Sequence, residues 1–412
     1  MKTLIHRQIA TVLLAGVAFM ATPALASTAA NTVIQNSVTV SFSDAANNAQ
    51  PDVTASVSIT VNLVASAPLV SVDPTSINPA TGNTSYDIDY TVTATANGPD
   101  LYLISSASVN TDMNGAPAFS GAASVALGAT TVANPASAGD TTIEVPFDAI
   151  ADGSVNGLAA GDTIILNPGM PNEESVVIAA GGIDESTGAS TNVVTLTLET
   201  ALNESHAIGS IIGQQRTVTV TVLTASTTLP ATSGTHVVTT TFTSQEDGAV
   251  TVDGDETTIT VVRPVLTVLK YVRNVDNAVT GTGARTVNSA TYYTAGVGGN
   301  PGDLMEYLIV VDNTAAGAVE ATDIIITDPI PQFITYESGS LRIDPATADA
   351  NGSGTWQVVA DGSSDNDAGT YDSANETVIF YAGAGGDDAT AEGGSLDADE
   401  FSFVKFQVRI DN

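Results

Sequence analysis

The chain has 412 residues, with 45 acidic and 10 basic side chains and a formal net charge of −35. A surface with this charge repels phosphate groups, which excludes nucleic acid and anionic membrane surfaces as partners. The chain contains no cysteine, so its stability has to come from hydrophobic cores, helped at most by bound metal, and its length suffices for two or three domains.

The first 26 residues predict a secretory signal. A short basic stretch precedes an apolar run from Ile9 to Met20 and the small-residue site Ala24-Leu25-Ala26. We expect cleavage after Ala26; a retained anchor is the alternative, although the apolar run is short for a membrane span. The expected mature protein starts at Ser27, does not insert into a membrane, and is secreted to the extracellular space or cell surface of a bacterium.

Alternation of apolar and polar residues predicts a long hairpin after the signal. The apolar side chains of its first strand fall on even positions: Ile34, Val38, Val40 and Phe42. The second strand alternates on odd positions from Val53 to Leu63, and residues 44–51 between the two strands are rich in turn formers.

Alternating Thr and Val residues continue along the chain, as is typical of a pleated sheet, and strong helical patterns are absent. Residues 27–128 together with 214–264 predict an N-terminal β-sandwich that includes the hairpin. Residues 129–213 contain short strands separated by Gly-Asp turns, which predict a small β-barrel or roll inserted in that sandwich. Arg263-Pro264 breaks the pattern and places a second domain at residues 265–412.

Three motifs follow one another in this last third of the chain: Leu266-Thr267-Val268-Leu269-Lys270, Pro301-Gly302-Asp303 leading into the strand Tyr307 to Asn313, and Asp328-Pro329-Ile330-Pro331. In this order they resemble the conserved repeat of bacterial surface proteins known as domain of unknown function eleven, over about residues 265–412. Residues 31–63 are more loosely similar to the openings of related exported proteins. The resemblance implies an immunoglobulin-like sandwich that serves as a spacer, adhesin or fibre module, without catalytic residues.

The predicted fold class is therefore all-β, with two immunoglobulin-like β-sandwich domains and a small β-barrel or roll inserted in the first. We expect no enzyme, because catalysis needs a nucleophile with a base, paired carboxylates in a cleft, or a metal with an open position. Beyond the signal the chain has only two histidines, His206 and His236, and no G-x-S-x-G or H-E-x-x-H arrangement. We interpret both histidines as structural.

Acidic loops of the second sandwich are the one candidate class of ligand site. Calcium prefers six to eight oxygen ligands from a flexible loop, and the chain offers these carboxylates: Asp361, Asp365, Asp367, Asp372, Asp387 and Asp388. The alternative is that they form solvated turns that keep the surface soluble. Calcium is the only cofactor that we consider.

Lys270 raises a separate question. Some surface sandwiches cross-link a core lysine to an asparagine, and the sequence does not decide whether Lys270 takes part in such an isopeptide bond. A missing ammonia in the intact mass would reveal it.

Two kinds of function remain after these exclusions. In the first, the chain is a subunit of an extracellular fibre or biofilm matrix that binds copies of itself, with the strand of Ile34, Val38, Val40 and Phe42 added to a neighbour's sheet. In the second, it is a cell-surface adhesin or binding module that displays the inserted unit; a calcium-dependent surface-layer component is a further alternative. The N-terminal strand can instead pair within its own domain, and the sequence leaves this open.

Overall fold

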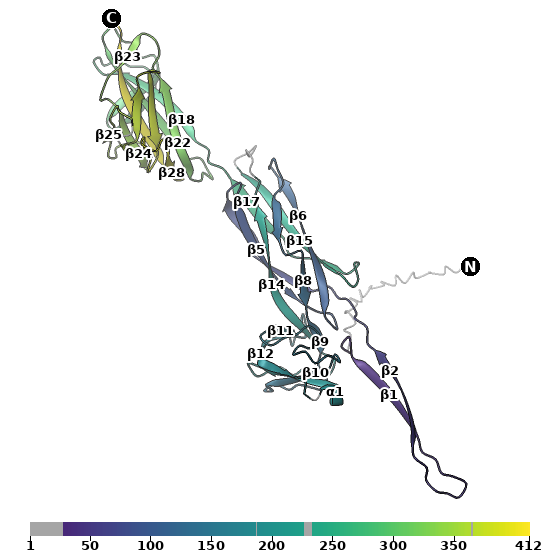
Figure 1. Ribbon diagram of the computed structural model, residues 1–412. Coiled ribbons are helices and arrows are strands. Elements are labelled where there is room, and N and C mark those ends of the chain that lie inside the picture. The colour runs from purple at the N-terminus through teal and green to yellow at the C-terminus, as the bar shows by residue number, and fades with distance from the viewer. Residues whose placement is uncertain (1–27, 187, 226–232, 364–365) are drawn as a thin grey trace, which may run out of the picture.

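The computed structural model describes residues 28–186, 188–225, 233–363 and 366–412 (Figure 1). The predicted signal, residues 1–26, lies outside these residues. The molecule is elongated: an N-terminal hairpin, a first sandwich with a small unit attached, and a second sandwich follow one another. The described part of the chain holds no helix with the length and hydropathy that a membrane span requires.

The hairpin consists of β1 (Val33–Val40) and β2 (Val53–Thr60), which form a two-stranded sheet of their own. In the first sandwich, one sheet contains the strands β3 (Leu69–Asp73), β5 (Ser85–Thr93), β14 (Ile211–Leu223) and β7 (Ala118–Gly121), in that order. The facing sheet contains β4 (Ser76–Ala80), β17 (Thr257–Val262), β15 (Ser233–Ser244), β6 (Asp100–Thr111) and β8 (Ser124–Leu127), with β16 (Thr251–Asp253) also paired to β15.

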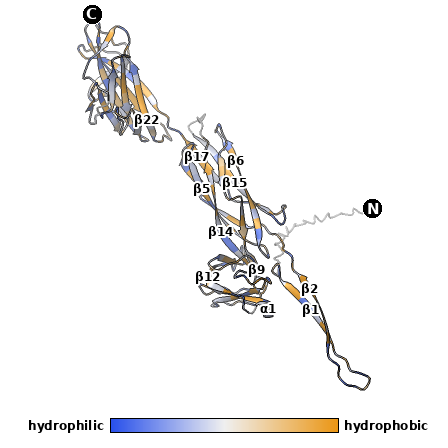
Figure 2. Cartoon of the chain, viewed as in Figure 1, coloured by the Kyte–Doolittle hydropathy of each residue, from blue (hydrophilic) through white to orange (hydrophobic). Residues whose placement is uncertain are grey.

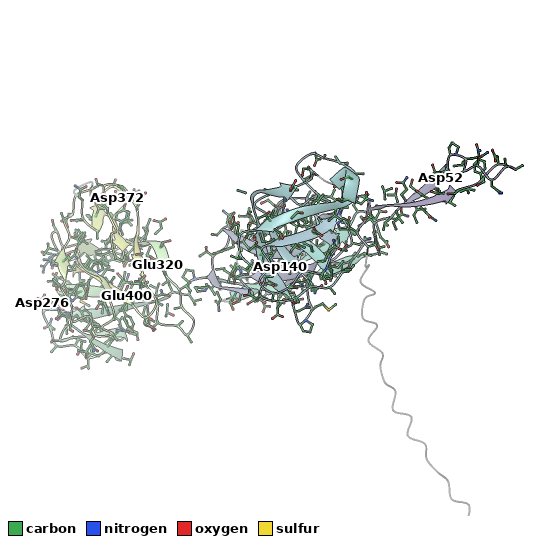
Figure 3. All side chains as sticks on the ribbon, turned by 90° about the horizontal axis from the view of Figure 1, so that it is seen from below. Asp52, Asp140, Asp276, Glu320, Asp372 and Glu400 are labelled. Atoms are coloured by element: carbon green, nitrogen blue, oxygen red, sulfur yellow. The ribbon has the colours of Figure 1, made fainter. Side chains whose placement is uncertain are left out.

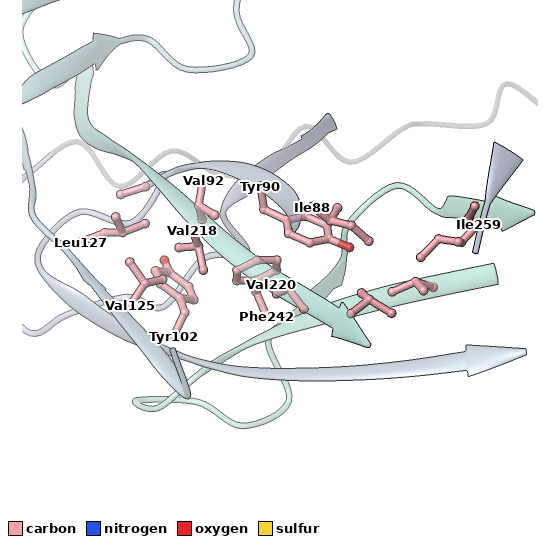
Figure 4. Packing of buried hydrophobic residues seen from close by; sticks show 14 of the residues in the cluster. Ile88, Tyr90, Val92, Tyr102, Val125, Leu127, Val218, Val220, Phe242 and Ile259 are labelled. Carbon is pink, nitrogen blue, oxygen red and sulfur yellow. The ribbon is translucent and has the colours of Figure 1, made fainter. Parts of the chain in front are cut away.

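The core of the first sandwich is built by alternate residues of these strands. Tyr90 from β5 and Phe242 from β15 meet edge to face, with ring centroids 5.8 Å apart, and both are fully buried (Figure 4). Ile88 and Val220 lie beside them, and Ile259 belongs to the same cluster farther along the sandwich. Because every second side chain points inward, the Thr/Val alternation of the sequence is what lets two sheets share one core.

The inserted unit contains β9 (Ala129–Thr131), β10 (Thr142–Pro146), β11 (Thr163–Leu166), β12 (Glu174–Asp184), the short helix α1 (Gly188–Thr191) and β13 (Val193–Leu198). Its strands run in the order β10-β13-β12-β11-β14, and β9 pairs with the other edge of β14. A hydrogen bond of 2.8 Å from Ala133 N to Glu144 O then joins the chain after β9 to β10, which closes a small barrel. Strand β14 belongs to both units, so the expected end of the insert at residue 213 falls inside a continuous strand.

The second sandwich has a larger sheet of β19 (Thr282–Val287), β20 (Ala290–Ala295), β18 (Thr267–Asn274), β21 (Leu304–Asp312), β29 (Phe401–Ile410), β24 (Arg342–Thr347) and β25 (Gln357–Val358), with β23 (Ile334–Tyr336) also paired to β29. The smaller sheet contains β26 (Gly369–Asp372), β27 (Thr377–Ala382), β22 (Ala321–Pro329) and β28 (Gly394–Leu396). The prediction of an all-β fold with two immunoglobulin-like sandwiches and a small inserted β unit is confirmed.

The turn before β21 shows why its sequence is Pro-Gly-Asp. Gly302 has φ +86°, a conformation that favours glycine. The carboxylate of Asp303 accepts hydrogen bonds from Asn300 N at 2.8 Å and from the side chain of Asn274 at 2.9 Å. Tyr307 then packs against Phe406, with ring centroids 5.5 Å apart. These motif residues therefore serve the architecture of the sandwich.

We expect the burial of His236 to make the first sandwich sensitive to mild acid. The ring is fully buried; Nδ1 donates to Asn110 Oδ1 at 2.7 Å, and Nε2 has no hydrogen-bond partner among the described residues. Burial lowers the pKa of His236, whereas the unfolded chain keeps the ordinary value of about 6.5. As the pH falls below about 6.5, the unfolded state binds the proton more readily, and stability is lost down to the folded pKa.

We expect this loss to be absent in the variant His236→Gln, whose side chain does not titrate. Amide exchange of β15 at pH 7 and pH 5 measures it locally, because the sole tryptophan, Trp356, lies in the other sandwich. Exchange rates are divided by the intrinsic rate at each pH, and an equal loss of protection in both proteins at pH 5 would show that another group causes the effect.

Candidate functional site

Both strands of the β1–β2 hairpin are exposed along almost their whole length. Its two strands pair with each other over eight residues, from Val33↔Thr60 to Val40↔Val53, and with no other described strand. Every residue from Ile34 to Thr60 is exposed or half-buried, and every residue of β2 is exposed. A two-stranded hairpin of this kind is at best marginally stable alone in water, so an unpartnered one needs an explanation.

The hairpin has one apolar and one polar face. Directly opposite residues share a face, and the register places Ile34 opposite Ile59, Val38 opposite Ala55 and Val40 opposite Val53. The apolar side chains stay in contact with water: Val38 is 57% exposed and Val57 is 65% exposed. Apart from Val33 at its base, the other face carries Ser, Thr and Gln side chains. Figure 2 shows hydrophobic and hydrophilic residues along both strands of the hairpin. Apolar surface gathered on one face of an ordered element marks an interaction site.

Charge is almost absent from this hairpin although the chain is strongly acidic. Neither β1 nor β2 contains a charged residue, and Asp44 and Asp52 in the connecting loop are the only charged residues between positions 28 and 63. Acidic side chains occur on the inserted unit, for example Asp140, and on the second sandwich, for example Asp276 and Glu400 (Figure 3). Two acidic molecules can therefore approach each other at the hairpin strands without placing carboxylates side by side.

The tip of the hairpin is ordered by Asp44. Its carboxylate accepts hydrogen bonds from the backbone N–H groups of Ala46 and Asn48, both at 2.9 Å, and from the side chain of Asn48 at 3.1 Å. The hydrogen bonds from Asn48 lower the pKa of Asp44. Asn47 adopts φ +63°, which asparagine tolerates in tight turns. The loop therefore holds both strands in register at their distal end.

The base of the hairpin is held by Asn97, which is only 2% exposed. Its Nδ2 donates to Thr28 O at 3.0 Å and to Asn62 O at 3.2 Å, and its Oδ1 accepts from Val64 N at 2.8 Å. One side chain thus joins the segments on both sides of the hairpin to the first sandwich, and we call this arrangement the Asn97 clamp. Ala30 packs in the same place against Gly98, where an added Cβ would lie 2.5 Å from the Cβ of Ala30.

The structure brings the four predicted assembly residues together on the apolar face: Ile34, Val38, Val40 and Phe42 are 45%, 57%, 54% and 50% exposed. Sequence reasoning did not assign the partners on β2, namely Val53, Val57 and Ile59, although their alternation was visible. It also missed Asn97, for which the sequence carries no periodic signal.

The acidic loop residues are used as hydrogen-bond acceptors within turns. Asp361 accepts from Tyr336 and Gly339, Asp367 from Ala360 N at 2.6 Å, and Asp372 from Asn375. Asp388 Oδ1 accepts from Asp367 N at 3.3 Å, and Asp387 accepts from Ala389 N at 2.8 Å. Asp365 lies outside the described residues. Within those residues, no three histidine, cysteine, aspartate or glutamate side chains form a group that could hold a metal ion.

The remaining candidate residues are buried or paired. His206 is 1% exposed, with Nε2 3.4 Å from Glu174 and Nδ1 3.2 Å from Asn167. Lys270 Nζ contacts both carboxylate oxygens of Asp328, at 2.5 and 2.7 Å, and lies 4.6 Å from the ring centre of Tyr307. The lysine thus joins β18 of the larger sheet to β22 of the smaller one.

Comparisons with known proteins give only distant likenesses. No protein-family model and no curated protein matches the chain. Among solved structures, the C-terminal domain of the Streptococcus pyogenes antigen I/II-family protein AspA is 11% identical over 84% of this chain and 91% of its own, with a TM-score of 0.31.

Two further solved structures match with lower TM-scores. The collagen adhesin CNA from S. aureus is 10% identical over 84% of this chain and 82% of its own, with a TM-score of 0.18. BcpA, the major pilin subunit of Bacillus cereus, is 9% identical over 68% and 69%, with a TM-score of 0.17. At these scores the likenesses carry no argument about what this chain does.

Proposed function

We propose that this protein is a structural subunit of an extracellular fibre or biofilm matrix and that it assembles with copies of itself through the β1–β2 hairpin. The exposed apolar face of that hairpin is the observation that carries the proposal. Burial of apolar surface contributes roughly 25 cal/mol per Å², and an added strand also gains main-chain hydrogen bonds. In this role the protein acts through its surfaces, outside the cell, and needs no catalytic residues.

A copy of the same chain is the favoured partner because the hairpin strands carry no charge. A basic partner would gain no ion pairs from these uncharged strands. A second copy carries the same net charge of −35 and would be repelled at most other surfaces, so the hairpin strands are where it can approach. The hairpin also projects away from the sandwiches (Figure 1), so another molecule can reach both of its free edges. A contact between two different surfaces that does not close into a ring grows into a filament.

The double variant Val38→Asp/Val40→Asp tests the proposal. Two carboxylates on the apolar face would have to be buried unpaired in the contact, at a cost of several kcal/mol each. We therefore expect the chain without residues 1–26 to form filaments in negative-stain images, and the double variant to remain monomeric with an unchanged melting temperature.

Ser37→Asp/Thr39→Asp is the matched control. It places the same two charges on the same strand but on the polar face, opposite Ser56 and Thr54. We expect filaments from the control. Filaments from the apolar-face variant, or no filaments from the unaltered chain at any concentration, would overturn the proposal.

A further inference from the structure

Strand β6 of the first sandwich has a free edge in its second half. On one side β15 pairs with β6 along almost its entire length. On the other side β8 covers only residues Asp100 to Leu103, and the last bond on that side runs from Ile104 N to Ala123 O at 2.9 Å. Among the described residues, no strand pairs with this side of β6 from Ser105 to Thr111.

The backbone groups that point to this edge belong to even-numbered residues. Ile104 N bonds on the β8 side, whereas Leu101 O accepts from Gln245 N on the β15 side. Because the groups of an antiparallel strand alternate between its two neighbours, Ser106 and Ser108 direct their N–H and C=O groups to the free edge. Such a row of main-chain groups is a template for another strand.

The interior of the sandwich is incompletely covered beside this edge. Even-numbered side chains of β6 face the core, and they become more exposed along the strand: Tyr102 is fully buried, Ser106 and Ser108 are half-buried, and Asn110 is exposed. A cavity of about 160 Å³ lies between the two sheets here, lined by Ile104, Ser106, Phe119 and Val220 among others. An added strand that presents apolar side chains inward would cover this gap.

Strand β1 has the properties that this gap requires. It spans eight residues, close to the length of the free edge, and it presents Ile34, Val38 and Val40 on one face. Residues 105–111 carry no charge, and neither does β1, so two acidic molecules can join there without pairing carboxylates. The hairpin of the same molecule points away from its own sandwich and is fixed at its base by the Asn97 clamp.

We propose that the free edge of β6, from Ser105 to Thr111, is the acceptor for strand β1 of a second copy of this chain. The proposal rests on the proposed function and names the second half of the contact. The apolar face of the incoming hairpin lies over the cavity, and its polar face continues the outer surface beside Ala107 and Val109. Each molecule then offers a hairpin to one neighbour and an edge to another, and the contact does not close.

Ser108→Pro blocks the acceptor. Proline removes an N–H that points to the free edge, is tolerated on edge strands, and leaves the hydrogen bonds between β6 and β15 in place. Ser108→Ala is the matched control, because it keeps the N–H and loses only the hydroxyl. We expect Ser108→Pro to raise the critical concentration for filaments at least about tenfold, and Ser108→Ala to leave it unchanged.

Mixing two blocked proteins gives the sharpest result. Ser108→Pro keeps an intact hairpin, and Val38→Asp/Val40→Asp keeps an intact β6 edge. Each alone should sediment as a monomer, and together they should form a one-to-one dimer but no filament. If Ser108→Pro forms filaments like the control while the hairpin variant does not, the acceptor is elsewhere and the proposed function stands; if both form filaments, the proposed function fails as well.

A cross-linking measurement covers the case in which Ser108→Pro does not fold. The chain has no cysteine, so an introduced cysteine can form a disulfide only with another introduced cysteine. One copy carries Thr39→Cys, and the other carries Ser105→Cys, Ala107→Cys or Val109→Cys. All four side chains lie on the outer face in the proposed contact. We expect a mixed disulfide dimer from at least one of the three pairs, and its absence from all three would overturn the assignment.

Discussion

Replacing Glu306 with alanine is expected to destabilise the second sandwich by about 3 kcal/mol, because it removes the buried member of a charge pair whose arginine is half-buried. Glu306 is 4% exposed; its carboxylate accepts from Tyr292 Oη at 2.6 Å, from Arg273 Nε at 2.8 Å and from Gln407 Nε2 at 2.8 Å. The substitution leaves the Arg273 guanidinium and two further donors without their acceptor.

The fluorescence of Trp356 measures this loss in denaturant, since it is the only tryptophan and packs near Phe403 in the same sandwich. Glu337→Ala is the control. Glu337 forms an ion pair of 3.3 Å with Arg409 on β29, the strand next to that of Glu306, but both side chains are more than 40% exposed. Exposed pairs contribute about 0–1 kcal/mol. Equal losses in the two variants would show that burial does not set the strength of the Glu306 interactions.

The same carboxylate gives the second sandwich an acid limit. Burial by itself raises the pKa of Glu306, but the hydrogen bonds from Tyr292, Arg273 and Gln407 outweigh it and lower the pKa overall. A lowered folded pKa stabilises the sandwich above the unfolded value of about 4.3, and this stability is lost as the pH falls through the folded pKa. The difference between the native chain and Glu306→Ala should therefore shrink below about pH 4.3.

The fold was largely predictable because apolar and polar residues alternate along its strands. The alternation from Ile34 to Phe42 and from Val53 to Leu63 predicted both strands of the hairpin and their shared loop. It could not predict exposure, since the same alternation results whether the apolar face is covered by the chain's own domain or by another molecule. The unpartnered state of β1 and β2 became visible only in three dimensions.

Other features depend on relations that a linear pattern does not record. Strand β14 runs from the inserted barrel into the first sandwich without a break, although the Thr/Val alternation begins only at Thr217 and no residue pattern marks the passage from one unit to the other. The cluster of aspartates from Asp361 to Asp372 predicted oxygen ligands. The sequence does not distinguish a turn aspartate that accepts backbone N–H groups from one that binds calcium. The free edge of β6 follows from where β8 ends, which no residue type marks.

We expect the Asn97 clamp to fix the orientation of the hairpin relative to the first sandwich. Replacing Asn97 with alanine removes three part-buried hydrogen bonds to the main chain of Thr28, Asn62 and Val64, at about 0.5–1.5 kcal/mol for each. We expect faster amide exchange throughout β1 and β2 and cleavage by proteases near residue 63. Since a loosened hairpin must be ordered again on binding, the critical concentration for filaments should rise at least about tenfold.

Asn62→Ala separates this effect from a general loss of stability. Asn62 is exposed and joins the clamp only through its carbonyl, which alanine keeps. The control should therefore exchange, resist proteases and form filaments like the native chain. If Asn97→Ala leaves hairpin exchange unchanged, the orientation of the hairpin is set elsewhere, by the packing of Ala30 against Gly98 or by the hydrogen bond of 3.3 Å from Asn31 to Asn156. If exchange accelerates while filaments form as before, the hairpin binds its neighbour without being aimed in advance, and the contact alone fixes the geometry of the fibre.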